Sequence, residues 1–566
     1  MISSDAASLG GYAGGVENAL KDLRDERVVE RMWEGDHTVW GPEPEEIANR
    51  LGWLRSPETT EGALPEIMDL VEAVRGEGIE HVVLLGMGGS SLAPETFGLA
   101  LKRQEGYPDL AVLDSTDPEA VLGLADGLDP AKTLFVVSTK SGGTVETFSF
   151  FKYFYNLVAE AVGGERASSH FVAITDPGSG LQDTAEKYGF RSIFLNDPNI
   201  GGRYSGLSLF GQVPAALVGV DVQKLLDGAK AAAQELRAAS TGPQENPGAW
   251  LGAVMGELAR AHGRDKLTLL TSPSLAAFGP WVEQLVAEST GKEGVGILPV
   301  DEEPVGSVDS YGDDRLFVYL GLQGEGVDGP SPDEMRRLGH PVVEILLDDA
   351  YELGAEMLRW EVATAVAGWR LGINPFDQPN VESAKTQARR MISEYAEKGE
   401  LPELEPTVVE GEMSVYTSEG AASVDEALRS FFGQARPGDY VALQAYLPPS
   451  EGTTATLQEL RVRIKEALKV ATTLGYGPRF LHSTGQLHKG DGGNGLFVQI
   501  TAGHGRDADI PDEAGEPASS LTFGVLEEAQ ALGDRQALLD AGRRVVRVDL
   551  GSDVDGGLRR LAEALS

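Results

Sequence analysis

The chain has 566 residues, of which 41% are hydrophobic and 24% charged, a composition typical of a globular protein with several domains. It contains no cysteine, which excludes disulfides, thiolate metal sites and cysteine nucleophiles and is compatible with a reducing cytoplasm. Its 88 acidic and 47 basic residues give a formal net charge of −41, which argues against binding to nucleic acid or to an anionic membrane. An anionic ligand would have to be held by local donors, because the overall field repels it.

The start of the chain has neither a basic n-region nor an apolar h-region, and no apolar run approaches the ~18 residues of a membrane span. We therefore expect a cytoplasmic protein without a signal peptide or membrane helix. Residues 1–75 are predicted to form a helical N-terminal segment, interrupted at Trp40-Gly41-Pro42.

From residue 76 onward, short apolar runs alternate with helical stretches. This rhythm predicts parallel sheets covered on both faces, with ligands at the carboxyl ends of the strands. A first unit, residues 76–225, has predicted strands at 82–85, 110–113, 134–137, 171–174 and 193–195. A second unit of the same type, residues 226–398, has predicted strands at 267–270, 296–300, 316–320 and 342–347 and a long helix at 350–369.

The character of the chain changes after Lys398. An acidic, proline-containing stretch at 400–407 is a predicted linker, and residues 408–566 are predicted to form a third α/β unit. Its predicted strands are 408–416, 440–447, 496–501 and 545–550, and its predicted helices are 457–473 and 534–542. The predicted fold class is therefore α/β, with two related parallel-sheet units, a third C-terminal unit and a helical N-terminal segment.

The first predicted strand ends in Gly86-Met87-Gly88-Gly89-Ser90-Ser91. This loop is similar to a dinucleotide-binding fingerprint, except that Ser91 stands at the third glycine position. Asp114, at the end of the next strand, would suit a ribose, so an NAD-dependent dehydrogenase is one alternative. Two glycines and two hydroxyls before a helix would equally suit a sugar phosphate.

The third predicted strand leads into residues 138–147, which hold five hydroxyl side chains and two glycines before a helix. Backbone N–H groups at a helix N-terminus, together with hydroxyl donors, bind a phosphate monoester well. There is no Walker pattern, which argues against a nucleoside triphosphate. The alternative is a Ser/Thr-rich turn with capping duties.

Three further segments carry charged or amide side chains. Arg203 follows glycines that let a ligand approach, so it could face a developing oxyanion. Ser274 is a predicted N-cap of a helix over 275–289 that stops at Gly291, and Gln284 and Glu288 share one face of it. Lys385 is predicted to lie about one turn into a helix that follows a proline-bounded loop, where a Schiff-base or proton-transfer role is conceivable. For each, the alternative is an ordinary solvated side chain.

Taken together, these segments resemble the glucose-6-phosphate isomerase family. Residues 86–91 resemble its GIGGS loop, 139–147 its SK[TS]xxTxET phosphate loop, 202–205 its GGRYS motif, 284–292 its QLxxESxGK motif and 374–385 its NxFDQxxVExxK motif. The five motifs occur in the family's order. The resemblance implies two flavodoxin-like sugar-isomerase (SIS) domains, in agreement with the two sheets predicted above.

The resemblance also implies roles for individual residues. Glu288 would be the base that moves a proton between C1 and C2, Arg203 would stabilise the cis-enediolate, and Lys385 would assist ring opening. The implied sugar- and phosphate-binding residues are Gly89, Ser90, Thr139, Lys140, Ser141, Thr144, Thr147 and Gln284. No cofactor is implied, and no metal-ligand cluster of histidines and carboxylates is visible in the sequence.

One feature departs from the family. The family usually carries a ring-opening histidine, in a GQHxF or LHSxGQ context, before the final lysine, but residues 310–315 contain none and His340 lies in a structural Gly-His-Pro turn. The predicted substitute is His488, in the segment 482–490 of the third unit; the alternative is that His488 makes a domain contact. This C-terminal part resembles that of bacterial isomerases fused to a transaldolase, although the transaldolase barrel itself is absent.

The predicted function is thus reversible isomerisation of glucose 6-phosphate and fructose 6-phosphate. Two alternatives are a sugar-phosphate-binding regulator without activity, which would lack the base, and the dehydrogenase suggested by residues 86–91. A sugar phosphate is the expected partner. The sequence is compatible with a homodimer but does not determine the oligomeric state.

Overall fold

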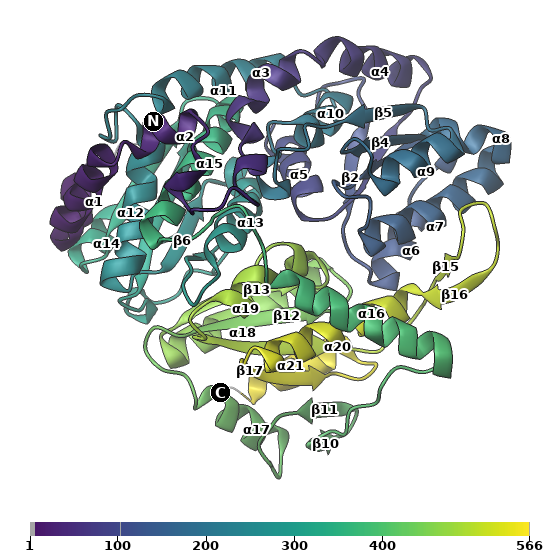
Figure 1. The fold of residues 1–566 in the computed structure, drawn as a ribbon. Helices are drawn as coiled ribbons and strands as arrows, with labels where there is room; N and C mark the ends of the chain where they lie inside the picture. The colour runs from purple at the N-terminus through teal and green to yellow at the C-terminus, as the bar shows by residue number, and fades with distance from the viewer. Residues whose placement is uncertain (1–5, 102, 565–566) are drawn as a thin grey trace.

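The computed structural model describes residues 6–101 and 103–564 and arranges them around three sheets (Figure 1). The C-terminal unit lies beneath the first two units, and the N-terminal helices pass over the second unit and on to the first (Figure 1). The α/β prediction with two parallel sheets, a C-terminal unit and a helical N-terminal segment is confirmed. None of the helices within the described ranges is both long and apolar enough to cross a bilayer.

The N-terminal segment is helical but more broken than its sequence suggested. Besides the predicted interruption near Trp40, the chain leaves the helix at Arg27, whose φ of 54° is left-handed. Trp53 is fully buried and helps to fix the segment to the first two units. Its α-helices are α1 (Ala13–Asp25), α2 (Val28–Trp33), α3 (Ser56–Glu61) and α4 (Leu64–Gly76).

The first unit has a five-stranded parallel sheet of order β2-β1-β3-β4-β5, the flavodoxin-like order. The strands are β1 (His81–Gly86), β2 (Asp109–Leu113), β3 (Thr133–Ser138), β4 (Phe171–Thr175) and β5 (Ser192–Leu195). Its helices are α5 (Leu92–Ala100), α6 (Pro118–Asp126), α7 (Val145–Val162), α8 (Gly164–Ala167), α9 (Gly180–Tyr188) and α10 (Leu209–Leu217). Because β1 and β3 are neighbours, their two loops meet at one edge of the sheet.

The second unit has a four-stranded parallel sheet of order β7-β6-β8-β9. Its strands are β6 (Lys266–Thr271), β7 (Leu298–Val300), β8 (Arg315–Leu322) and β9 (Val342–Leu347). Its helices are α11 (Val222–Leu236), α12 (Pro247–His262), α13 (Gly279–Thr290), α14 (Pro332–Arg337) and α15 (Leu353–Leu371). The prediction that Ser274 caps the helix is wrong: α13 begins at Gly279 with Pro280 in its first turn, and Ser274 bonds Glu325 instead.

The third unit has a mixed sheet of order β10-β11-β17-β14-β12-β13, in which β10 and β11 run antiparallel. The strand predicted at 408–416 is a hairpin that turns at Gly411, and the helix predicted through Thr473 ends at Leu468, which leaves β13 as a missed strand. The strands are β10 (Val408–Glu410), β11 (Met413–Tyr416), β12 (Tyr440–Tyr446), β13 (Ala471–Tyr476), β14 (Gly495–Thr501) and β17 (Arg544–Asp549), beside a separate hairpin of β15 (Asp509–Pro511) and β16 (Ser519–Thr522). The helices are α17 (Val424–Phe432), α18 (Glu451–Leu468), α19 (Gly485–Gly490), α20 (Phe523–Asp540) and α21 (Val554–Glu563).

Two contacts dock the third unit onto the others. Arg461 of α18 is 1% exposed and donates to the backbone oxygens of Asp301 at 3.0 Å and Glu302 at 2.9 Å in the second unit. Helix α16 (Val381–Lys398) packs along α20, so close that a side chain at Gly533 would meet the backbone of Ala388 (Figure 1). Helix α16 therefore lies spatially with the third unit, although it follows the second in sequence.

The division of the chain at 1–75, 76–225, 226–398 and 408–566 remains our proposal for the domains. The three separate sheets support it. Its outermost residues, 1–5 and 565–566, lie outside the described part of the chain.

Candidate active site

A cavity of about 320 Å³ lies at the carboxyl ends of β1 and β3, between the first unit, α13 and the C-terminal unit. Its position is the one expected for a ligand in an open parallel sheet. Ten residues predicted from the sequence line it: Gly89, Ser90, Thr139, Lys140, Ser141, Thr144, Arg203, Gln284, Glu288 and Lys385. The structure therefore brings together segments that are spread over more than 290 positions of the chain.

The glycines after β1 are required by close packing. Gly88 has a left-handed φ of 53°, and a side chain there would lie 2.8 Å from the amide of Gln284. A side chain at Gly89 would lie 2.0 Å from the backbone oxygen of Gly202. The loop is thus pressed against the segment that carries Arg203, and the absence of side chains keeps the floor of the cavity open.

The hydroxyl-rich loop follows β3 and enters α7 at Val145. Thr139 and Thr144 are joined by a hydrogen bond of 2.9 Å between their hydroxyls, and Lys140 is paired with Asp176, which also lines the cavity. The N-terminus of an 18-residue helix is a favourable place for an anion. Thr147 does not line the cavity: it is fully buried in the first turn of α7.

Arg203 is 2% exposed, and every one of its N–H groups has a partner. Its Nε donates to the Ser289 hydroxyl at 2.7 Å, and Nη1 donates to Glu288 at 3.1 Å and to the side chain of Gln378 at 2.8 Å. Nη2 donates to the backbone oxygens of Pro375 at 2.7 Å and Asp377 at 3.0 Å. Because the guanidinium is saturated, a ligand oxygen can bond to it only by replacing one of these partners.

Glu288 and Gln284 lie on one face of α13, as their spacing of four indicated. The Gln284 amide donates to Glu288 at 3.1 Å and to the backbone oxygen of His482 at 2.9 Å. Glu288 thus receives hydrogen bonds from Arg203 on one oxygen and from Gln284 on the other, and its side chain remains 14% exposed to the cavity. A carboxylate fixed in this way, with a permanent positive charge 3.1 Å away, can exchange a proton with a bound ligand.

Lys292, at the end of the same segment, has a structural part in the site. It is fully buried, and its ammonium bonds the backbone oxygen of Asn374 at 2.8 Å and the carboxylate of Asp377 at 2.7 Å. Burial and the neighbouring Arg203 lower the pKa of Lys292 to about 8. The lysine therefore holds the loop that supplies Gln378 and leads to Lys385.

The structure does not bring His488 to this cavity. His488 is 2% exposed and packs among the rings of Phe480, Phe497 and Tyr440 in the C-terminal unit. Burial, with Lys489 and Arg543 nearby, holds the pKa of His488 well below its usual range. The ring is thus kept neutral and away from the other predicted residues.

The histidine that lines the cavity is His482, which was not among the residues predicted from the sequence. Its Nε2 lies 2.9 Å from a carboxylate oxygen of Glu146, to which Gln530 also donates at 2.7 Å. Burial tends to raise the pKa of Glu146, but the bonded His482 outweighs this effect and the pKa lies below its usual value. The sequence could have identified His482, because residues 481–486 match the LHSxGQ context in which the family carries its histidine.

Arg479 fixes the His482 segment to the first unit. It is paired with Glu95 and donates to Asp114 at 2.9 Å. Ser91 also donates to Asp114, at 3.3 Å, and Asp114 is only 7% exposed. The carboxylate that would hold a ribose in the dehydrogenase alternative is therefore already occupied by the protein itself.

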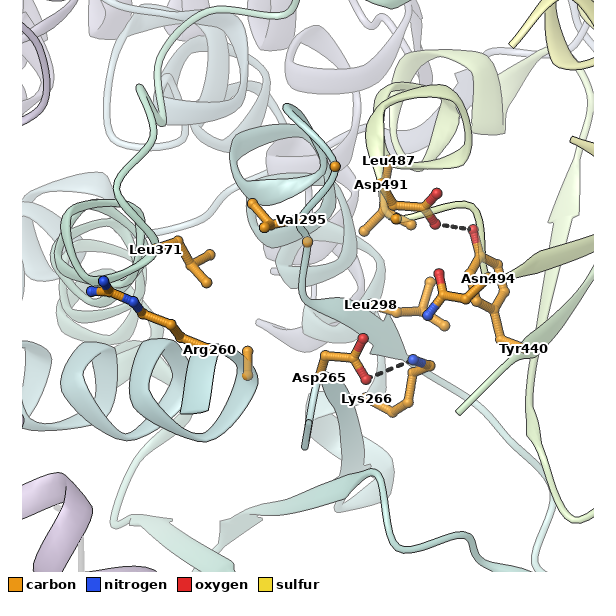
Figure 2. A pocket seen from close by; sticks show the side chains of 14 residues that line it. Arg260, Asp265, Lys266, Val295, Leu298, Leu371, Tyr440, Leu487, Asp491 and Asn494 are labelled. Atoms are coloured by element: carbon orange, nitrogen blue, oxygen red, sulfur yellow. Dashed lines mark hydrogen bonds and ion pairs between the residues drawn. The ribbon is translucent and has the colours of Figure 1, made fainter. Parts of the chain in front are cut away.

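A separate cavity of about 220 Å³ lies between the second and third units and shares no residue with the first (Figure 2). Two pairs of its polar groups are bonded to each other: Lys266 donates to Asp265 at 2.6 Å, and the Tyr440 hydroxyl donates to Asp491 at 2.8 Å (Figure 2). None of the residues predicted for the site lines this cavity, so we place the candidate active site in the larger of the two.

Glu283, next to Gln284, makes the stability of this region depend on pH. Burial raises the pKa of its carboxyl to about 7, against the influence of Arg461 and Arg479. The folded state therefore holds this proton more tightly than the unfolded chain. The free energy of unfolding should fall by on the order of 3 kcal/mol as pH rises from about 4.5 to about 7, and below that window the contribution of this group is fully present.

We therefore expect Glu283→Gln to melt at a higher temperature than the unmodified protein at pH 8, and the gain to shrink at pH 5. Thermal melts at pH 5, 6, 7 and 8 measure the difference. Glu66→Gln, on the exposed face of α4, is the control and should give no pH-dependent difference. A gain that is equal at all four pH values would show that the Glu283 proton is not linked to folding.

Comparison with known proteins bears on the family of the chain. A family profile described as phosphoglucose isomerase matches residues 69–298. Glucose-6-phosphate isomerase from Rubrobacter xylanophilus is 32% identical over 407 residues, which cover 61% of this chain and 92% of that protein. The enzyme of the same name from Carboxydothermus hydrogenoformans is 30% identical, covering 59% of this chain and 83% of that protein.

Two solved structures share the fold. A hypothetical protein from Thermus thermophilus superposes with a TM-score of 0.58 at 27% identity, covering 69% of this chain and 99% of its own. A glucose-6-phosphate isomerase from Chlamydia trachomatis has a TM-score of 0.55 at 19% identity, covering 68% of this chain and 86% of its own. Fold and site together define an α/β protein of the double sugar-isomerase-domain type. The chain belongs to the glucose-6-phosphate isomerase family.

Proposed function

We propose that this protein interconverts glucose 6-phosphate and fructose 6-phosphate, with Glu288 as the base. The observation that carries the proposal is the position of Glu288: it is held by Arg203 and Gln284 on the wall of the cavity whose other side is the hydroxyl-rich loop. One end of the ligand would thus be anchored by its phosphate while the carboxylate reaches its carbon atoms. A sugar phosphate with a free C1–C2 end has both features.

In the proposed mechanism, the phosphate binds to Thr139, Ser141, Thr144 and the N–H groups before α7, with Lys140 adding charge. Gly89, Ser90 and Gln284 contact the sugar. The Gln284 side-chain oxygen has no partner among the described residues, as expected for a group that waits for a ligand hydroxyl. The hydroxyl of Thr147, buried in the first turn of α7, also has no partner among the described residues, and its contact with the phosphate remains part of the proposal.

The isomerisation requires a hydroxyl proton to move from O2 to O1 of the aldose, and it also requires one proton to leave C2 and be delivered to C1. Glu288 takes and returns this proton, and the charge of Arg203 stabilises the enediolate that forms in between. Since Arg203 has no free N–H, the developing oxygen would displace Gln378 or Glu288 from Nη1. The guanidinium is held in place beforehand, so only one of its hydrogen-bond partners has to move when the charge develops.

Ring opening must precede the proton transfer, and we assign it to His482 in place of His488. His482 lines the cavity and is oriented by Glu146 in a histidine–carboxylate pair that can pass a proton to or from the ring oxygen. Lys385, also on the wall of the cavity, assists through its charge. The third unit thereby contributes to the chemistry of the first two.

The decisive experiment is a coupled assay with fructose 6-phosphate, glucose-6-phosphate dehydrogenase and NADP⁺. We expect NADPH to form only when this protein is present. A protein that binds 6-phosphogluconate but yields no NADPH would be the regulator alternative. Direct reduction of NAD⁺ without the coupling enzyme would indicate the dehydrogenase.

The proposal also concerns the type of the C-terminal unit and the cellular location of the protein. Residues 408–566 are of the kind found in bacterial isomerases fused to a transaldolase, which their sequence resemblance supports. A cytoplasmic location is supported by the cysteine-free composition and by a phosphorylated substrate.

A further inference from the structure

Outside the active-site cavity, three potential metal ligands that are remote in sequence come together. Asp117 lies at the N-terminus of α6, His504 in the loop after β14, and Glu527 in the second turn of α20. One ligand atom from each of the three residues lies within 4.8 Å of the other two. The cluster joins the first unit to the C-terminal unit.

Both carboxylates carry an oxygen without a partner among the described residues. Asp117 is fully buried; its Oδ1 caps α6 by accepting from Glu119 at 2.8 Å and Ala120 at 3.0 Å, while Oδ2 has no hydrogen bond and lies 4.0 Å from His504. Glu527 is 2% exposed, with Oε2 at 3.3 Å from His504 and Oε1 unpaired. An ion or a water molecule can complete a buried carboxylate oxygen that the protein leaves without a partner.

The charged groups around Glu527 are all acidic, whereas His504 acts on Asp117 in the opposite direction. Burial raises the pKa of Glu527 well above its usual value, and the charged groups that act on it, Asp117, Glu528 and Asp507, all raise it further. The pKa of Asp117 is also raised, again mainly by burial. A cation bound between the two carboxylates would offset this repulsion.

The position of His504 is fixed by the segment that carries it. The next residue, Gly505, donates its N–H to Glu119 at 3.1 Å, and Arg506 bonds Asp126 at 2.9 Å, so the loop is clamped along α6. On the other side, a side chain at Gly524 would lie 3.0 Å from the imidazole. The histidine is thus held between two helices, while 19% of its side chain remains exposed as a route for an ion.

We propose that Asp117, His504 and Glu527 bind one divalent transition-metal ion, such as Zn²⁺ or Mn²⁺. One imidazole nitrogen and two carboxylate oxygens form a three-ligand set that leaves a position for water. Ligands at about 2.0–2.2 Å from one ion stand roughly 3–4 Å apart. Asp117 lies 4.0 Å from Nδ1 of His504 and Glu527 lies 3.3 Å from Nε2, so the imidazole has to turn for one nitrogen to share the ion with both carboxylates.

The bound ion would brace α20 against α6. One turn along α20 from Glu527, Gln530 accepts from Thr116 at 2.7 Å and donates to Glu146, the carboxylate that orients His482. The site lies next to the path by which the C-terminal unit positions its histidine. It does not depend on the identity of the substrate.

The test is isothermal titration of the full-length, chelator-treated protein with ZnCl₂ and with MnCl₂. We expect one ion per chain and a melting temperature that rises with the ion concentration. His504→Gln and Glu527→Gln should each weaken binding at least about tenfold and remove the rise. His81→Gln is the matched control, because His81 also lies 2.8 Å from a carboxylate, that of Asp109, but in a cluster of only two, and it should bind as the unmodified protein does.

A second measurement does not rely on variants. Co²⁺ added to the unmodified protein should give visible d–d absorption of a nitrogen- and oxygen-ligated site, and Zn²⁺ should remove it. The proposal is overturned if the unmodified protein binds none of these ions, in which case His504 contacts the two carboxylates without a metal. It is equally overturned if both variants, shown to be folded by their melting curves, bind as tightly as the control.

Discussion

Glu288→Gln is expected to lower kcat for isomerisation by about 10²–10⁴-fold, the contribution of a positioned general base. Glutamine keeps the length of the side chain and an oxygen for Arg203, so the cavity should retain its shape, but the amide cannot accept the proton from C2. The loss should therefore appear in kcat and not in binding. Steady-state rates from the coupled assay, with titration of 6-phosphogluconate for affinity, measure the two effects separately.

The control for this experiment is Glu293→Gln, an exposed carboxylate just beyond the end of the same helix. It should keep both turnover and affinity. If Glu288→Gln turned over within about tenfold of the unmodified protein, Glu288 would not be the base. If it lost 6-phosphogluconate binding as well, the carboxylate would be holding the cavity together, and the kcat comparison would have to be repeated with Glu288→Asp.

The second large effect is expected from the two histidines of the C-terminal unit. His482→Gln should lower kcat/KM with equilibrated sugar phosphate by about 10²-fold or more, because the ring forms could no longer be opened by a positioned acid–base group. His488→Gln should keep turnover within about tenfold, since His488 does not line the cavity. Its cost should appear as a lower melting temperature, because a buried aromatic contact is lost.

The proposed role of His482 also predicts how the rate depends on enzyme concentration. If His482 opens the ring, the variant should act only on open-chain sugar, so its rate should stop increasing with enzyme concentration once spontaneous ring opening limits the supply. The unmodified protein should show no such ceiling. If the rate of His482→Gln stayed proportional to enzyme concentration and equal to that of the unmodified protein, His482 would have no part in the reaction. If only His488→Gln lost activity, the ring-opening role predicted for His488 from the sequence would be restored.

The regular elements of the two first units were largely predictable. The strand predicted at 82–85 lies within β1, and the one predicted at 342–347 has the bounds of β9. Both are continuous apolar runs, which is the signature of a strand buried on both faces. The errors occur where the local signal is ambiguous. Helix α18 ends at Leu468, where Lys469 adopts the left-handed conformation that glycine usually has at the end of a helix. Because no glycine stands there, the sequence did not indicate the end of the helix, and β13 was missed.

The loops after β1 and β3 could be foreseen as parts of one site because parallel strands deliver their carboxyl ends to the same edge of a sheet, and the motif at 284–292 placed Glu288 and Gln284 on one helix face. That much follows from periodicity and spacing along the chain. Two other results depended on contacts between units. His482 and His488 are six positions apart, and only the docking of Arg479 on the first unit turns one toward the cavity and leaves the other in a core. Likewise, Asp117, His504 and Glu527 are brought together by α6 and α20, and no local pattern can encode a distance set by the packing of separate sheets.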